Sequence, residues 1–323
     1  MTKEIELKDV IEFKDGNYVI ASDSGFSVQD VNELLAQTAA RGGGNAMEQM
    51  LALATTIVEP IDQALPYILT YAPFFTEVPI GDLEDPSIPR EQDIIGLCFA
   101  VHPESEVFFV RPSFRWYRPE LQEFSTGVEM PWKLMQRTGW NTLQRMMLRA
   151  TDCIARQIDA MARAALDATI LATAGMAATQ AGTTLTKAAM DAVIKAAHIL
   201  GFPMVRAAIN SGTVTDMAGW TAGATLSTIS PPEREARELL QRLYLGNYGG
   251  VDFSSNPFVP TRFLYFAGQS NMTGFHIVRG RTRADSDVDV RKGIDLHAIR
   301  TAEHAFSVEN ANNIRRLEIT GLI

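Results

Sequence analysis

The sequence predicts an α+β fold, with strands and helices in separate blocks along the chain. Three observations indicate this class. A stretch rich in branched and aromatic residues precedes residue 131, one long amphipathic helix follows it, and short strands separated by turn residues fill the C-terminal part. Strands and helices do not alternate regularly and no internal repeat is visible, so a sheet built from βαβ units is not expected.

The composition indicates a folded protein that is not specialised for binding nucleic acid. Of its 323 residues 46% are hydrophobic, which is enough for one large core or two modest ones. The formal net charge of −9 argues against a surface that grips phosphates. Its 29 basic residues comprise only seven lysines, and arginine is enriched in protein interfaces while lysine is depleted. This favours extensive subunit contacts, although GC-rich codon usage explains the skew equally well.

Neither a membrane segment nor a secretion signal is predicted, so we expect the chain to remain inside a cell. No run of about 18 apolar residues occurs, and charges stand at the N-terminus where a signal peptide needs an apolar stretch. Cys98 and Cys153 are far apart and lack the spacing of a metal or redox pair, so we expect buried free thiols.

The first ninety residues predict mostly extended structure. Residues 28–40 have a helical pattern, and the glycine run of residues 41–45 interrupts regular structure after it. Closely spaced prolines between Pro60 and Pro89 exclude a long helix or a central strand. We therefore expect coil that lies on another surface over residues 61–91.

An exposed flap is predicted next. Residues 94–101 and 106–110 have β-strand composition and form a hairpin around the turn 102–105. The segment after the hairpin alternates guanidinium groups with aromatic rings, a mixture typical of interface hot spots: Arg111, Phe114, Arg115, Trp116, Tyr117 and Arg118. We expect these side chains to meet carboxylates of a neighbouring subunit. The alternative is that the rings fold back onto their own subunit.

The long helix, predicted over residues 133–173, has one apolar and one charged face. The apolar residues recur every three or four positions: Leu143, Met147, Ala150, Ile154, Ile158, Met161, Ala165, Ala168 and Ala172. The charged residues alternate in sign at the same spacing: Arg149, Asp152, Arg156, Asp159, Arg163 and Asp167. We expect this charged face to stay in solvent or to meet another subunit, with the first four of these residues as candidate contacts. An ordinary solvated helix face is the alternative.

The C-terminal half predicts short helices and strands, with one long strand near the end. The predicted helices cover residues 186–200, 213–220 and 231–244, the first of them capped by Gly201. The predicted strands cover residues 204–209, 251–253, 262–267, 275–278, 295–309 and 315–319.

No catalytic constellation is evident in the sequence. The motifs of phosphate-binding loops, dinucleotide-binding folds, serine hydrolases and zinc proteases are absent. Two of the five scattered histidines, His297 and His304, are seven apart on a predicted strand and therefore point to opposite faces. We assign no catalytic, cofactor-binding or metal-binding residues. An enzyme with an unrecognised site is the alternative from another class.

The order of these parts resembles the Hong Kong 97-like major capsid protein family of tailed bacteriophages. The most specific segments are Ile158-Asp159 in the long helix, Arg206 to Asn210, and Ala305 to Val308. The resemblance implies an N-terminal arm (1–60), a hairpin called the E-loop (92–132), a spine helix (133–173) and an axial domain (174–275). A peripheral domain would combine residues 61–91 and 276–323 with the spine.

The resemblance also implies a function. Members of the family assemble into icosahedral shells of hexamers and pentamers that enclose double-stranded DNA without sequence-specific binding. Assembly in the host cytoplasm, a place in the virion, a portal, an optional decoration protein and, given the short N-terminal region, a separate scaffolding protein are expected. Some members join subunits through a flap lysine, but none occurs between Gln92 and Trp132, so we expect noncovalent contacts. A cellular cage of the encapsulin type is the alternative.

Overall fold

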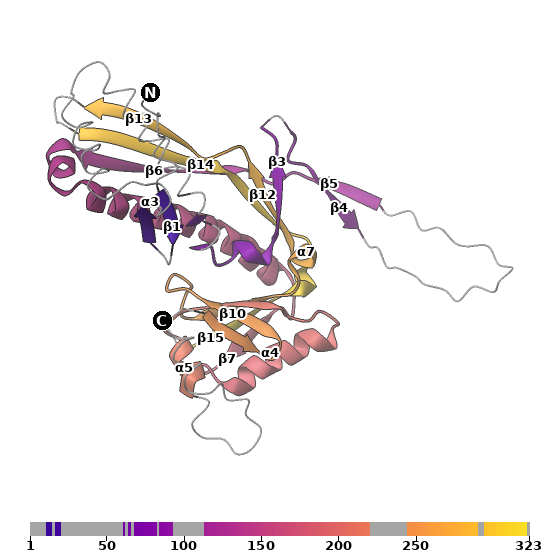
Figure 1. Cartoon of the computed structure of the whole chain (residues 1–323). Helices are drawn as coiled ribbons and strands as arrows, with labels where there is room; N and C mark the ends of the chain where they lie inside the picture. Colours follow the sequence, from indigo (N-terminus) through magenta and orange to yellow (C-terminus); the bar gives the residue numbers. More distant parts are fainter. Residues whose placement is uncertain are drawn as a thin grey trace.

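The computed structural model describes residues 11–14, 17–20, 61, 64–65, 68–82, 84–92, 113–219, 244–289 and 294–321. Figure 1 shows two bodies, each built around a β-sheet, with the long helix α3 (Trp132–Ala172) running along the first and reaching the second. The predicted segments 28–40, 41–45, 94–101, 106–110 and 231–243 lie outside the described residues.

The helix α3 confirms the predicted spine helix, at 41 residues. From Met147 to Ile158 its buried stripe follows the prediction, and beyond Ile158 it departs from it. Beyond that point Ala162, Leu166 and Ile170 are buried, whereas Ala168 and Ala172 are exposed. Burying Leu166 and Ile170 removes more apolar surface from water than burying alanines would, and the position of the sheets determines which set of residues is covered. Cys153 is exposed beside the stripe, so the prediction of a buried thiol is wrong there.

The first body contains a five-stranded sheet whose central member is the long strand β14 (Ile294–Val308). The 15 residues of β14 confirm the long strand predicted over 295–309. The other strands are β13 (Arg283–Asp289), β12 (Gly274–Arg279), β3 (Thr76–Ile80) and β6 (Gln122–Pro131). Strand β6 pairs with β14 from Gln122 to Pro131, so these residues belong to the sheet and not to the predicted flap 92–132.

Residues 61–91 contain more regular structure than the predicted coil. Ile61, Ala64 and Leu65 are helical and buried, and the short helix η3 covers Ala72–Phe74. Strand β3 pairs in parallel with β12 at the edge of the sheet. It contains Pro79, which an edge strand tolerates because one side of it needs no ladder hydrogen bonds.

The second body contains a six-stranded sheet in the order β7-β15-β11-β8-β10-β9. Its strands are β7 (Ala177–Gln180), β8 (Arg206–Ile209), β9 (Tyr244–Tyr248), β10 (Val251–Ser255), β11 (Phe263–Ala267) and β15 (Ile314–Ile319). The last strand lies between β7 and β11. The prediction that residues 276–323 all lie with the spine is therefore wrong for β15, because its backbone partners are in this second sheet.

Short helices complete the two bodies. Helix α4 (Lys187–Ile199) begins after Thr186, whose hydroxyl accepts a hydrogen bond from the backbone N–H of Ala189. It ends before Gly201, which takes the predicted capping role with φ of +79°. Helix α5 (Val214–Gly219) follows β8, and helix α7 (Ser270–Thr273) connects β11 to β12.

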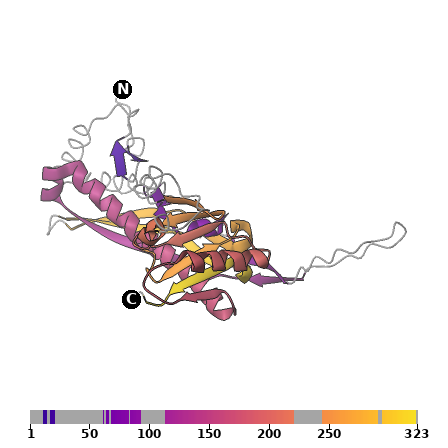
Figure 2. The ribbon, with the colours of Figure 1, turned by 90° about the horizontal axis from the view of Figure 1, so that it is seen from below.

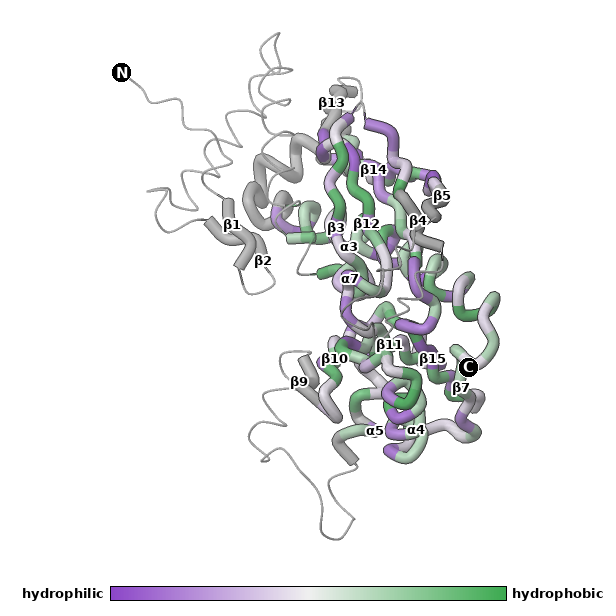
Figure 3. The backbone as a smooth tube through the Cα atoms, turned by 90° about the vertical axis from the view of Figure 1, so that its right-hand side faces the viewer, coloured by the Kyte–Doolittle hydropathy of each residue, from purple (hydrophilic) through white to green (hydrophobic). Residues whose placement is uncertain are grey.

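The two hydrophobic cores meet at the six-stranded sheet. One face of that sheet packs with α4 around residues such as Phe253, Phe266 and Leu317. The other face contributes to a larger core that also contains the buried stripe of α3 and residues of the five-stranded sheet. Figure 3 shows hydrophobic stretches inside both bodies. The helix α3 is therefore shared between the two sheets.

Candidate inter-subunit surfaces

A two-stranded ribbon projects from the first body. Strand β4 (Ile88–Gln92) pairs antiparallel with β5 (Ser113–Tyr117), from Ile88 opposite Tyr117 to Gln92 opposite Ser113. This pairing brings together the two ends of the predicted hairpin. Figures 1 and 2 show the ribbon and the N-terminal end of α3 extending toward opposite ends of the molecule. At its base, Ile88 packs with Ile277 and Ala305 of the five-stranded sheet.

The ribbon carries most of the aromatic residues predicted for the flap. Phe114 and Arg115 lie on β5, and Arg111 lies outside the described residues. The side chain of Trp116 is 66% exposed and that of Tyr117 is 39% exposed. Since a tryptophan gains from burial, this exposure favours a contact that the single chain does not provide. Arg118 forms an ion pair with Asp85 at the base of the ribbon, where both side chains are exposed.

The charged face of α3 divides into free and engaged residues. Arg149 is exposed and Asp152 is half-buried. Asp159, by contrast, accepts hydrogen bonds from the backbone N–H groups of Thr70 and Tyr71 at 3.0–3.1 Å. Burial raises the pKa of the Asp159 carboxyl above its ordinary value, and the two backbone donors oppose that rise. The prediction that this face stays in solvent or meets a neighbour is therefore wrong at Asp159, which fixes the 70–71 segment to the helix.

The C-terminal part of this face joins α3 to the second body. Asp167 accepts hydrogen bonds from the Tyr265 hydroxyl at 3.0 Å and from Arg316 at 2.7 Å. The guanidinium of Arg156 lies 3.7 Å from the centre of the Phe258 ring, a close cation–π contact. Arg156 is exposed, so a second contact with a neighbouring subunit remains a prediction.

The structure brings together two histidines that the sequence leaves scattered. His276 on β12 and His304 on β14 are buried, and their ring nitrogens Nε2 and Nδ1 lie 3.1 Å apart. Burial, with a further contribution from the charge of His304, lowers the pKa of His276 to about 3, and burial lowers that of His304 to about 4. Neither is a plausible general base near neutral pH because each lies deep in the core.

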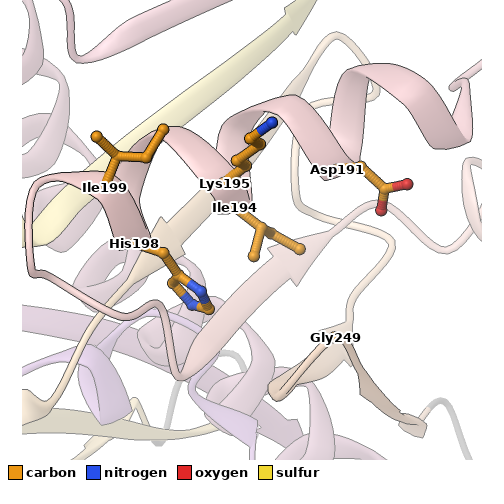
Figure 4. A pocket seen from close by; sticks show the side chains of 6 residues that line it. All are labelled: Asp191, Ile194, Lys195, His198, Ile199 and Gly249. Carbon is orange, nitrogen blue, oxygen red and sulfur yellow. The ribbon is translucent and has the colours of Figure 1, made fainter.

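A shallow depression of about 480 Å³ lies on the second body beside α4. Asp191, Lys195 and His198 line it together with Ile194, Ile199 and Gly249, and their side chains diverge (Figure 4). Tyr248 donates a hydrogen bond to Asp191 at 2.7 Å. The depression therefore does not bring a nucleophile and a base together.

Two further kinds of site are missing from the part of the chain that the structure describes. No group of three or more histidine, cysteine, aspartate or glutamate side chains there is arranged to hold a metal ion. None of the described helices combines the length and the apolar character needed to cross a membrane.

Comparisons with solved structures identify the fold. No protein-family model matches the sequence, and no curated protein matches it. The chain is similar to the mature capsid of bacteriophage PhiM1, with a TM-score of 0.52 and 11% identity over 79% of this chain and 88% of that one. A structure from Microbacterium phage Oxtober96 gives a TM-score of 0.55 and 12% identity over 78% and 90%. A virus-like particle from Pyrococcus furiosus gives 0.50 and 10% over 82% and 98%.

These similarities show that the chain has the Hong Kong 97-type capsid fold, as its sequence predicted. The intrachain partners of Asp159 and Asp167 were missed because they lie 88 or more residues away in sequence. The histidine pair was missed because its members lie 28 residues apart, on two different strands. Its one local signal is the alternation on β14, which places His304 and Phe306 on the same face.

Proposed function

We propose that this protein is the major capsid protein of a tailed bacteriophage, assembling into an icosahedral shell of hexamers and pentamers. The observation that carries the proposal is the fold shared with the PhiM1 capsid over 79% of this chain. The shell would enclose double-stranded DNA without reading its sequence. The net charge of −9 supports this, because an acidic wall does not bind the phosphates strongly.

The parts of the subunit follow the boundaries of the observed elements. We assign the N-terminal arm to residues 1–60 and the E-loop to a flap based on β4 and β5, over about residues 88–117. The peripheral domain comprises α3 and the five-stranded sheet. The axial domain comprises the six-stranded sheet with α4 and includes β15.

The shell itself is the main partner in this proposal. Copies of the chain contact one another, while a separate scaffolding protein directs assembly, a portal occupies one vertex and a decoration protein is optional. Assembly takes place in the host cytoplasm and the product resides in the virion. The subunit has a structural role and no catalytic one.

The contact between neighbours is proposed to involve the flap. Trp116 and Tyr117 are exposed on the ribbon, and Arg115 adjoins them on β5. Arg149 and Asp152 on α3 are candidate partners because their side chains are at least partly accessible. Burying an exposed tryptophan in a neighbour's surface is the kind of contact that dominates interface energies.

A cellular cage is the second candidate. The similarity to the Pyrococcus furiosus particle, at a TM-score of 0.50, favours it specifically. The two candidates differ in what they enclose. Particles from the native source that contain double-stranded DNA support the phage shell, and particles that contain a cargo protein support the cage.

Electron microscopy of the purified protein tests the proposal. We expect the wild-type chain, alone or with a scaffolding protein, to form closed shells of uniform size. The double variant Arg115→Ala/Trp116→Ala should fold normally, by circular dichroism, and yield few or fragile shells. A wild-type protein that stays monomeric under every assembly condition would contradict the proposal. Normal shells from the double variant, with unchanged thermal stability, would exclude the flap as the contact that holds neighbouring subunits together.

A further inference from the structure

The buried histidine pair occupies a row of aromatic rings in the first body. His276 stacks on Phe306 with ring centres 4.3 Å apart and an angle of 7° between the planes. His304 lies 5.3 Å from His276 on one side and 6.5 Å from Phe124 on the other. Phe306 also contacts Phe75 at 5.1 Å. The row thus crosses from β6 over β14 and β12 to the segment that precedes β3.

This row belongs to the packing between the five-stranded sheet and α3. Phe75, Phe124 and Phe306 are part of, or pack against, the core that contains the buried stripe of α3. His276 is 5% exposed and His304 is 7% exposed. The two polar rings are therefore held in an apolar layer, where their shared hydrogen bond satisfies one nitrogen of each.

No described carboxylate faces the pair from the neighbouring strands. Glu77 on β3 is opposite His276 in the register, but its side chain is exposed. Gln122 on β6, opposite His304, is uncharged. Glu303 on β14 is paired with Arg279 of β12 at 2.5 Å.

The other charged residues near the histidine pair also have partners of their own or do not face it. Glu123 on β6 is paired with Arg283 at 3.2 Å. The part of α3 in this core presents apolar residues such as Ile154 and Ile158. The neighbouring carboxylate, Asp159, is engaged by the backbone N–H groups of residues 70–71, and no carboxylate contributes to the lowered pKa of either histidine. A proton on either histidine ring would therefore have no counter-charge among the described residues.

We propose that the His276–His304 pair is an acid-sensitive lock that holds the five-stranded sheet against α3 while both rings are neutral. In the neutral pair one ring donates its N–H and the other accepts. A first proton leaves a cation in an apolar layer without a counter-charge. A second proton removes the acceptor and sets two donors against each other at 3.1 Å. Acid therefore loosens this part of the subunit.

The direction of the pH dependence follows from the lowered pKa values. An unfolded histidine takes up its proton near pH 6.5, whereas the folded pair resists uptake down to about pH 4 and about pH 3. Between these limits the unfolded chain binds more protons, so stability falls as the pH falls. The stabilisation is complete above about pH 6.5. This lock is a property of the subunit and does not depend on the proposed shell.

The test is the urea unfolding of the full-length protein between pH 7 and pH 4. The variant His276→Phe/His304→Phe keeps two stacked rings and removes both titrating groups. His198→Gln is the matched control, because this histidine is exposed on α4. From pH 7 to pH 4 the unfolding equilibrium constant of the wild type and of the control should rise at least about a hundredfold more than that of the double variant does. Equal pH dependence in all three proteins would overturn the proposal.

A second measurement keeps the proposal testable should the double variant fail to fold. Nuclear magnetic resonance of wild-type protein labelled with ¹³C at its histidine rings follows each of the five histidines directly. At least two ring signals should show no protonation above about pH 5 while the protein stays folded. Fewer than two such signals would overturn the proposal regardless of what the protein assembles into.

Discussion

The two faces of the six-stranded sheet are built from the same strands but are held by different forces. On β11 and β15, Leu264, Phe266 and Leu317 point to the α4 side, where they pack in a buried apolar cluster. The alternate residues Tyr265 and Arg316 point to α3 and share the carboxylate of Asp167. The α4 face is therefore stabilised mainly by buried apolar area, which has no preferred direction. Its directional contacts with the helix include an exposed hydrogen bond from the Tyr248 hydroxyl to Asp191. The α3 face differs in that its directional bonds include a largely buried ion pair between Arg316 and Asp167.

This difference matters because α3 is packed on both sheets. Its core includes Phe306 of the five-stranded sheet as well as Ala208 and Ile314 of the six-stranded one. Hydrogen bonds at 2.7 and 3.0 Å fix where the helix lies, whereas an apolar contact tolerates sliding. In the proposed shell, the angle between the two bodies affects how neighbouring copies meet. The α3 face is thus where a small change should alter geometry as well as stability.

The largest expected effect is on the α4 face. Phe253 is fully buried and makes an edge-to-face contact with Phe266 at 6.2 Å. The substitution Phe253→Ala removes a buried ring and leaves a cavity, which should cost about 3–5 kcal/mol of unfolding free energy. Urea unfolding measures the loss.

Hydrogen exchange then shows how far the damage spreads. If the α4 face is a unit of its own, protection should fall in β8, β10 and α4 while β14 keeps its protection. An equal loss of protection in β14 would mean that the two bodies unfold together. In that case the contrast between the faces would have no consequence for stability.

The elements that were predicted from the sequence are those that local patterns determine. The periodicity of α3 and the alternation along β14 each act within one element, and the Gly201 terminus depends on adjacent residues. The stripe of α3 was wrong beyond Ile158 because two sets of positions fit the same period. Which set is buried depends on the sheets that cover it.

Long-range pairing could not be predicted from one sequence. Strand β15 joins β7 and β11 in parallel and antiparallel pairs, and nothing in Arg315 to Ile319 indicates these partners. The hydrogen bonds of Asp159 to the 70–71 segment depend on the same kind of information. Side chains with a strong local preference were therefore assigned correctly more often than polar side chains with distant partners.

The next effect in size is on the α3 face. Arg316 is 8% exposed, and Asp167 is the nearer of its two carboxylate partners. The substitution Asp167→Ala leaves this guanidinium poorly paired and removes the acceptor of the Tyr265 hydroxyl. We expect a loss of about 2–4 kcal/mol in the free energy of unfolding.

Two controls show whether the loss comes from breaking the Asp167–Arg316 ion pair or simply from removing a negative charge from α3. The substitution Asp152→Ala removes a carboxylate from the same helix face and should change stability by less than about 0.5 kcal/mol. The double variant Asp167→Leu/Arg316→Met replaces the pair with apolar groups and should recover most of the loss. A double variant as unstable as Asp167→Ala would show that the packing of Arg316, rather than its charge pair, fixes the helix.

The smallest expected effect concerns the edge of the contact between α3 and the second body, where Arg156 covers the ring of Phe258. The contact distance of 3.7 Å indicates a cation–π interaction, but Arg156 is exposed and the ring is 46% exposed. Water screens such a contact, so Arg156→Ala should cost only about 0.5–1 kcal/mol in unfolding free energy. The exposed Arg149 on the same helix is the matched control, and Arg149→Ala should leave the unfolding free energy almost unchanged. Because Phe258 belongs to the second body, a shift in Tm for Arg156→Ala alone ties the spine to that body. Equal and negligible shifts for both variants would instead leave Asp167 as the polar contact that holds α3 to the second body.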